Sequence, residues 1–259
     1  MNLWHQMTWE EIGQLTESGM DAALLPVGAT EQHGPHLGCG MDSEIAERLS
    51  LQVSENTQIA LLPTLPYGCS IGHSKRWPGT IALQPKTLID VVKEIGDWVH
   101  ASGFKRLFIL NSHVSNFAPL HCALEILRAE HDGFMVAIIN SATVSDRVKE
   151  RHFEDAFDWH ANEAETSLMM AVAPDLVRED RLLDSDDPDR TEDCVFSHPV
   201  NRTSLNGVTG KPSLATVDKG QILFDWMVED LSNLVIKGLQ ETAPLAESYF
   251  KHTQSTNGK

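Results

Sequence analysis

Hydrophobic positions along the chain fall into two alternating kinds of segment. Runs that are apolar throughout predict four buried strands, over residues 22–27, 59–62, 107–110 and 135–139. Apolar residues at helical spacing predict a short helix after Thr8 and longer ones over residues 42–53, 88–99, 117–129, 164–172 and 222–239. Because the strands show no polar alternation, both faces of their sheet are expected to be covered. The pattern therefore predicts an α/β fold with a mostly parallel central sheet flanked by helices.

Composition changes this picture little. The 259 residues are 41% hydrophobic and 22% charged, and no repeat or composition shift marks a boundary. We therefore expect a single domain over residues 1–250, followed by a polar tail over residues 251–259. Residues 178–193 are acidic and rich in turn formers, which favours an exposed excursion from the domain.

Charge and targeting signals limit the partners. Asp and Glu total 37 against 20 Lys and Arg, a formal net charge of −17, so the surface repels nucleic acids and anionic membranes. The N-terminus shows no signal peptide, and no apolar run has the ~20 residues that span a bilayer. The four cysteines are dispersed and form no CxxC pair. These features predict a cytoplasmic protein without nucleic acid or membrane partners and leave a small-molecule substrate open.

Polar side chains cluster after the predicted strands. Glu31, His33 and Asp42 follow the first strand, His113 follows the strand over residues 107–110, and His160 comes beyond the last. Carboxyl ends of parallel strands meet at one edge of a sheet, so these groups are expected to lie together. Mixed carboxylate and imidazole donors suit Zn²⁺, Mn²⁺ or Fe²⁺ better than Ca²⁺ or Mg²⁺. Spacing alone also permits hydrogen-bonded loop residues without a metal.

Motifs of other enzyme classes are missing from the sequence. There is no HExxH helix of a zinc protease and no GxSxG elbow of a serine hydrolase. The first strand is not followed by GxGxxG, which argues against a dinucleotide-binding dehydrogenase.

A series of ordered motifs resembles the creatininase (creatinine amidohydrolase) family. The matching stretches are LPVGATEQHGPHL over residues 25–37, LPYGCS over 65–70, WPGTI over 77–81, NSH over 111–113, HANEAETS over 160–167 and NGVTG over 206–210. The resemblance implies a divergent member with a creatininase-like α/β sandwich and hydrolysis of a C–N bond. It also implies two divalent metal ions, with Zn or Mn expected and Fe compatible, and a homo-oligomer, often a hexamer.

The same resemblance implies roles for five residues. Glu31 and His33 would bind different metal ions, and Asp42 would bridge them. His113 would complete the first metal site. His160 would be the catalytic histidine that assists proton transfer to the leaving nitrogen.

Departures from the family pattern fall at the second metal site. Creatininase has Tyr-Glu where this chain has Val114 and Ser115, so a carboxylate ligand of the second metal is missing. Many relatives instead carry a glutamate three residues after the catalytic histidine, where this chain has Glu163, and positions i and i+3 of a helical turn face the same way. The resemblance therefore implies that Glu163 replaces the missing ligand. Glu165 is the rival candidate. Asn162 stands at a usual glycine, and since asparagine tolerates a left-handed backbone, no displacement of the site is expected there.

Substrate-binding residues also differ from the family pattern. Ser70 and His73 are retained on the loop that lies near the substrate in the family, but Gly72 stands where relatives commonly carry glutamate. We interpret this change as altered specificity, so creatinine itself is not the expected substrate. Trp77 and Trp159 are predicted to wall the pocket, with core packing as the alternative role.

Three functions follow from the sequence. The first is a metal-dependent amidohydrolase that cleaves a small cyclic amide, lactam or formamide through a metal-bridging water. The second is a peptidase of the same family that trims a modified peptide. The third is a metal-binding family member without turnover, against which the retained His160 argues, since a binding protein needs no proton donor.

Overall fold

Five parallel strands form the centre of the structure, in the order β1-β3-β2-β4-β5. They are β1 (Asn2–Leu3), β2 (Ala22–Val27), β3 (Ala60–Leu61), β4 (Arg106–Asn111) and β5 (Met135–Asn140). The structure is a computed structural model and describes residues 1–244. β2, β4 and β5 pair in register, so that Val27, Asn111 and Asn140 end side by side. The carboxyl ends of the three strands therefore form one continuous edge, as the sequence predicted for a parallel sheet.

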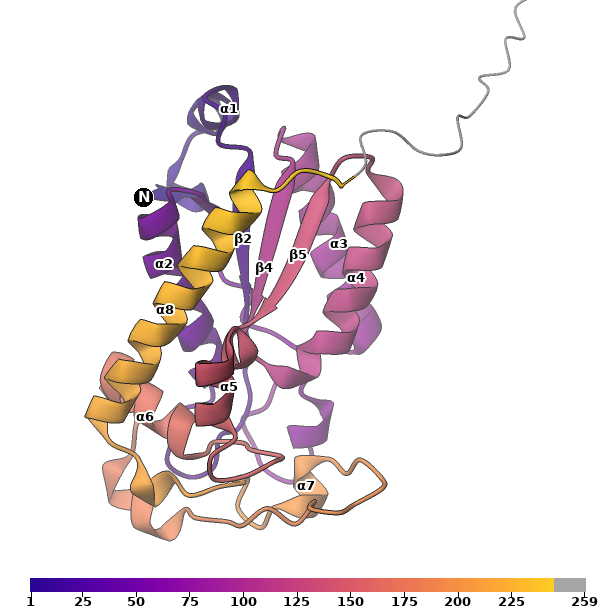
Figure 1. Ribbon diagram of the computed structural model, residues 1–259. Helices are drawn as coiled ribbons and strands as arrows, with labels where there is room; N and C mark the ends of the chain where they lie inside the picture. The colour runs from indigo at the N-terminus through magenta and orange to yellow at the C-terminus, as the bar shows by residue number, and fades with distance from the viewer. Residues whose placement is uncertain (245–259) are drawn as a thin grey trace, which may run out of the picture.

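Helices cover both faces of this sheet (Figure 1). They are α1 (Trp9–Glu17), α2 (Met41–Thr57), α3 (Pro85–Ala101), α4 (Phe117–Glu130), α5 (Asp146–His152), α6 (Glu163–Val172), α7 (Val200–Thr203) and α8 (Val217–Gln240). Alternate residues of β2 enter opposite cores: Ala22 and Leu24 pack with α2, α6 and α8, whereas Ala23 and Leu25 pack with α3 and α4. The predicted α/β fold with a doubly covered sheet is confirmed.

Local signals explain where the helices begin and end. Thr8 and Glu11 form a capping box at the start of α1, and Pro85 occupies the first turn of α3. Gly103 follows α3 with φ of +94°, the left-handed conformation that a glycine after a helix adopts most easily. α8 begins earlier than the apolar spacing predicted, because the Thr216 side chain caps it by accepting from the Lys219 amide.

Other elements differ from the sequence predictions. β3 is shorter than the apolar run over residues 59–62, and α5 and α7 were not predicted. The acidic stretch over residues 178–193 is not a wholly exposed excursion. Asp187 is 3% exposed, and its carboxylate accepts hydrogen bonds from the Ser204 hydroxyl and the Leu205 amide. Most of the stretch is exposed as predicted, and the departure is confined to a few residues around Asp187, which is tied to the loop after α7.

A close contact fixes α8 against α6. A Cβ atom at Gly220 would overlap the backbone carbonyl of Ser167, so glycine lets the two helices approach.

No helix within residues 1–244 is long and apolar enough to cross a membrane. The polar tail predicted from residue 251 lies outside the described residues.

Candidate active site

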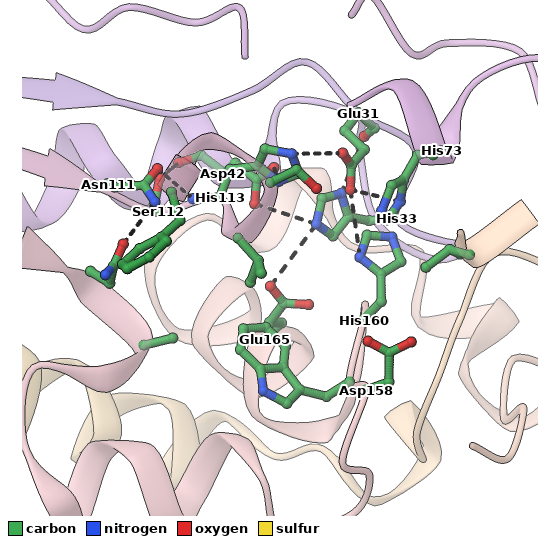
Figure 2. A pocket seen from close by; sticks show the side chains of 18 of the residues that line it. Glu31, His33, Asp42, His73, Asn111, Ser112, His113, Asp158, His160 and Glu165 are labelled. Carbon is green, nitrogen blue, oxygen red and sulfur yellow. Dashed lines mark hydrogen bonds and ion pairs between the residues drawn. The ribbon is translucent and has the colours of Figure 1, made fainter. Parts of the chain in front are cut away.

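A pocket of about 590 Å³ opens at the carboxyl ends of β2, β4 and β5. Its floor holds most of the polar residues that the sequence placed at this edge. Figure 2 shows the group, which we call the inner cluster: Glu31, His33, Asp42, His73, His113, His160 and Glu165. Every member is less than 10% exposed. The fold thus gathers residues from distant parts of the sequence in a site with little access to water.

Glu31 lies at the centre of three imidazole rings. Its Oε1 is 2.9 Å from His73 Nδ1 and 3.5 Å from His160 Nδ1, and its Oε2 is 3.2 Å from His113 Nε2. Burial alone would raise the pKa of Glu31, but the histidines, His113 foremost, lower it well below its ordinary value. The Glu31 side chain is therefore ionised although it is buried, because positive or metal-bound neighbours stabilise its negative charge.

Asp42 lies between His33 and His113, the second of which also contacts Glu31. Its Oδ1 lies 3.5 Å from His33 Nε2, and its Oδ2 lies 3.2 Å from His113 Nδ1. Burial opposes charge on these groups, yet their mutual attraction lowers the pKa of Asp42 to about 2 and raises that of His33 to about 10. Asp42 sits in the first turn of α2, where Gly40 is the N-cap and makes no side-chain bond. The Asp42 carboxylate faces the site and does not cap the helix.

Glu165, and not Glu163, brings a carboxylate from α6 to the inner cluster. Glu165 Oε1 lies 4.0 Å from His33 Nε2, and its Oε2 accepts from the Ala161 amide at 2.6 Å. Glu163 instead pairs with Arg151 and accepts from the Ser167 hydroxyl at 2.8 Å. The structure therefore corrects the expectation for Glu163.

The cause of that correction is the start of α6. The helix begins at Glu163, with Asn162 as its N-cap, so His160 is not part of a helical turn and the i, i+3 rule does not apply. The left-handed backbone lies at Ala161, with φ of +50°, rather than at Asn162. Asn162 accepts from the Glu165 amide through its side chain. The chain thus turns sharply between the histidine and the helix.

Backbone groups fix both the main chain and the ring of His160. It pairs with Thr209 through two backbone hydrogen bonds of 3.0 and 2.8 Å. Its Nε2 lies 2.9 Å from the Gln32 carbonyl, to which it donates, so Nδ1 carries no proton in the neutral ring and lies 3.5 Å from Oε1 of Glu31. Burial, with the charges of His73 and His33, lowers the pKa of His160 well below its ordinary value. The ring is therefore neutral and able to accept a proton at Nδ1.

Residues predicted to contact substrate divide into two pairs. His73 and Trp159 line the pocket. Ser70 does not line it: the residue is fully buried and its hydroxyl lies 3.2 Å from His113 Nε2. Trp77 does not line it either, because its ring is stacked under the Arg76 guanidinium at 5.2 Å. Gly72 lines the pocket close to Pro199, which a Cβ there would approach to 3.1 Å.

One residue that contacts the inner cluster, and several that line the pocket, escaped the sequence reasoning. Gln32 is 4% exposed and its Nε2 lies 3.2 Å from both His160 Nε2 and the Gly207 carbonyl. Its place between Glu31 and His33 was a usable signal, since an intervening residue in an extended segment points the other way. Phe153 and Val200 also line the pocket, and no periodic pattern could have indicated them.

Unpaired oxygen atoms test whether this donor set fits metal ions. Both carboxylate oxygens of Glu31 and Oδ2 of Asp42 are buried and, apart from the imidazole nitrogens beside them, have no hydrogen-bond donor within residues 1–244. Buried charged oxygens without donors are costly unless a cation is coordinated. Ligand atoms of two overlapping groups, Glu31–His33–Asp42 and His33–His160–Glu165, lie within 4.8 Å of one another. The inner cluster therefore fits divalent metal ions of the kind that mixed carboxylate and imidazole donors bind.

Comparison with known proteins settles the family. A family model described as Creatininase: Creatinine amidohydrolase matches residues 5–235. The chain belongs to the creatininase family. Creatinine amidohydrolase of Pseudomonas putida is 29% identical over 245 residues, covering 89% of this chain and 94% of that protein. The mycofactocin precursor peptide peptidase of Mycobacterium ulcerans (strain Agy99) is 31% identical over 235 residues, covering 85% and 88%.

Solved structures of the family agree with the fold. A crystal structure of creatinine amidohydrolase (creatininase) has a TM-score of 0.82 at 26% identity, covering 93% of this chain and 98% of that chain. Other similar creatininase structures are described as a Zn-Zn type and as a Mn form. The predicted membership of a divergent creatininase-family protein is confirmed, and the names of its relatives describe hydrolases.

Proposed function

We propose that this protein is a metal-dependent amidohydrolase that cleaves the C–N bond of an amide-type substrate. One observation carries the proposal: the buried carboxylates of Glu31, Asp42 and Glu165 converge on the imidazoles of His33 and His113, with oxygen atoms left for cations. A neutral histidine, His160, stands beside them. Family membership supports the same reaction class, because the Pseudomonas putida relative is a creatinine amidohydrolase.

Two metal ions would share Asp42. Glu31 and His113 would complete one ligand set, and His33 with Glu165 the other, since Asp42 lies beside both histidines, Glu31 beside His113 and Glu165 beside His33. Glu165 thereby replaces the carboxylate that Ser115 does not supply. Zn²⁺ or Mn²⁺ is the proposed occupant, with Fe²⁺ compatible with the same donors. When bound, such ions acidify water and polarise a carbonyl oxygen.

Protein groups then handle the proton. His160 Nδ1 is unprotonated and faces the inner cluster, because Nε2–H is committed to the Gln32 carbonyl. Nδ1 accepts the proton of the attacking water and delivers it to the departing nitrogen, as a general base followed by a general acid. The Gln32 carbonyl stabilises the positively charged ring in between. The backbone pairing with Thr209 fixes the position of the imidazole throughout.

Metal content tests the ligand assignment. Glu165→Gln keeps an oxygen for the Ala161 amide but removes the charge, so we expect roughly one metal ion fewer per chain by plasma mass spectrometry. Glu163→Gln is the matched control on the same helix and should retain the wild-type content. Equal metal loss in both variants would refute the assignment of Glu165. Wild type that takes up no metal after chelation and reconstitution would overturn the proposed function.

A peptidase is the second candidate. The pocket volume of about 590 Å³ is in the range that holds drug-sized ligands, more than a simple lactam fills. A relative that is 31% identical is a mycofactocin precursor peptide peptidase. Assays of the metal-loaded protein against cyclic amides, formamides and C-terminally extended peptides separate the two candidates by which class is turned over.

A further inference from the structure

The pocket lining combines carboxylates with five histidines. It includes four carboxylates but neither lysine nor arginine. Three of the four, Glu31, Asp42 and Glu165, belong to the inner cluster, where divalent ions would offset them. The fourth, Asp158, belongs to none of the candidate ligand groups. One negative charge of the pocket is thus left for something other than a metal ion.

The Asp158 side chain is free although its backbone is fixed. The Asp189 carboxylate accepts from the amides of Phe157 and Asp158 at 3.0 and 2.9 Å, which fixes the turn. The Asp158 carboxylate itself makes no hydrogen bond and no ion pair within residues 1–244 and is half-buried at the pocket wall. Figure 2 shows it on the His160 side of the pocket, two residues before that histidine.

Aromatic residues line the same pocket wall as Asp158 and include its two neighbours in the sequence. The centroid of Phe153 is 6.2 Å from that of Phe157 and 6.0 Å from that of Trp159, and all three residues line the pocket. Lys149 lies over the Phe153 ring at 5.9 Å but is not part of the lining. We call Phe153, Phe157, Asp158 and Trp159 the outer wall. A carboxylate that shares a pocket wall with aromatic rings suits an organic cation. The carboxylate attracts the cation by its opposite charge, and the rings attract it through their quadrupoles.

We propose that Asp158 is a specificity residue that binds an ammonium, amidinium or guanidinium group of the substrate, next to an apolar portion that packs on the outer wall. The same charge distribution disfavours substrates that carry a carboxylate or phosphate at this position. The proposal rests on the proposed function, because the inner cluster must hold the amide whose substituent reaches Asp158.

Matched hydroxamates test the proposal without requiring turnover. The hydroxamate group chelates the bound metals, and a para substituent on benzohydroxamic acid extends toward the pocket wall. The three probes carry aminomethyl, ethyl or carboxymethyl groups, and titration calorimetry on the metal-loaded protein gives their dissociation constants. We expect the cation to bind at least roughly tenfold more tightly than the neutral probe, and the anion at least roughly tenfold more weakly.

Variants assign the effect to Asp158. Asp158→Asn should remove the cation preference while leaving affinity for the neutral probe within about twofold, which also shows that metals and fold are intact. Asp158→Lys should reverse the order and favour the anion. Glu192→Gln, which removes an exposed carboxylate from the loop before α7, should behave as wild type.

Two failures are distinguishable. If the neutral hydroxamate binds wild type but the cation shows no advantage, or if Asp158→Asn keeps that advantage, the role of Asp158 is refuted and the hydrolase proposal stands. If the neutral hydroxamate does not bind the metal-loaded protein at all, the proposed function fails, and this inference fails with it.

Discussion

The inner cluster and the outer wall occupy one pocket but differ in almost every physical respect. Glu31 and Asp42 are at most 2% exposed and each faces at least two histidines. In the outer wall, Phe157 is 75% exposed and Asp158 has no polar partner for its carboxylate within residues 1–244. Mutual neutralisation fixes the inner groups, whereas the outer groups depend on a ligand. Reaction chemistry and substrate choice are therefore expected to respond to different substitutions.

Removing the proton carrier should have the largest effect. His160→Gln deletes Nδ1 beside Glu31, so kcat should fall by about 10²–10⁴-fold, the usual contribution of general acid–base catalysis. Metal content, measured in parallel, should stay at the wild-type level. A loss of metal together with activity would instead make His160 a ligand, in the group that it forms with Glu31 and His73.

A buried histidine beside the outer wall should make stability depend on pH. His152 is 2% exposed, its ring lies 5.1 Å from Trp159, and burial lowers its pKa from 6.5 to about 4. Because the folded state then binds fewer protons than the unfolded state, stability contributed at pH 7 is lost as pH falls from about 6.5 toward 4. The loss is about 3 kcal/mol, from a shift of roughly 2.5 pKa units at ~1.4 kcal/mol each.

Denaturant unfolding of wild type and His152→Asn at several pH values between 4 and 7 measures this effect. Asparagine can still donate to the Val148 carbonyl, which His152 Nδ1 contacts at 2.9 Å, but it does not titrate. The variant should therefore show the shallower dependence on pH. Parallel curves for the two proteins would contradict a neutral His152.

Truncating the outer wall should have the smallest effect on the fold. Phe157→Ala removes a ring that is mostly exposed, so the free energy of unfolding should change by less than about 0.5 kcal/mol. For a cationic aromatic amide, KM should rise by roughly three- to tenfold with kcat nearly constant. A matched fall in kcat would mean that the two parts of the pocket are not separable.

Sequence reasoning reached the fold and much of the inner cluster for an identifiable reason. The apolar runs gave β2, β4 and β5, and parallel strands must end at a common edge, so Glu31, Asp42 and His113 had to lie near one another. Nothing in that argument required contacts between distant loops. Strand direction and the short spacing between each strand and its polar residues are enough to place these residues together.

The carboxylate from α6 could not be assigned in the same way. Whether Glu163 or Glu165 reaches the site depends on where the helix begins and on the left-handed backbone at Ala161, a conformation that spacing does not reveal. Ala161 is held there by the Glu165 carboxylate itself, through a contact four residues along the chain. The outer wall was harder still, because its rings are brought together by loops without periodicity.

Gly220 sets the position of the longest helix by the absence of a side chain. A methyl group there would meet backbone atoms of Ser167, which no choice of rotamer can relieve. Ser167 stands two residues after Glu165, so displacing α8 would also shift the turn that carries this carboxylate. Substitutions in the pocket wall therefore disturb the fold little, whereas replacement of this one distant glycine requires concerted change in two helices.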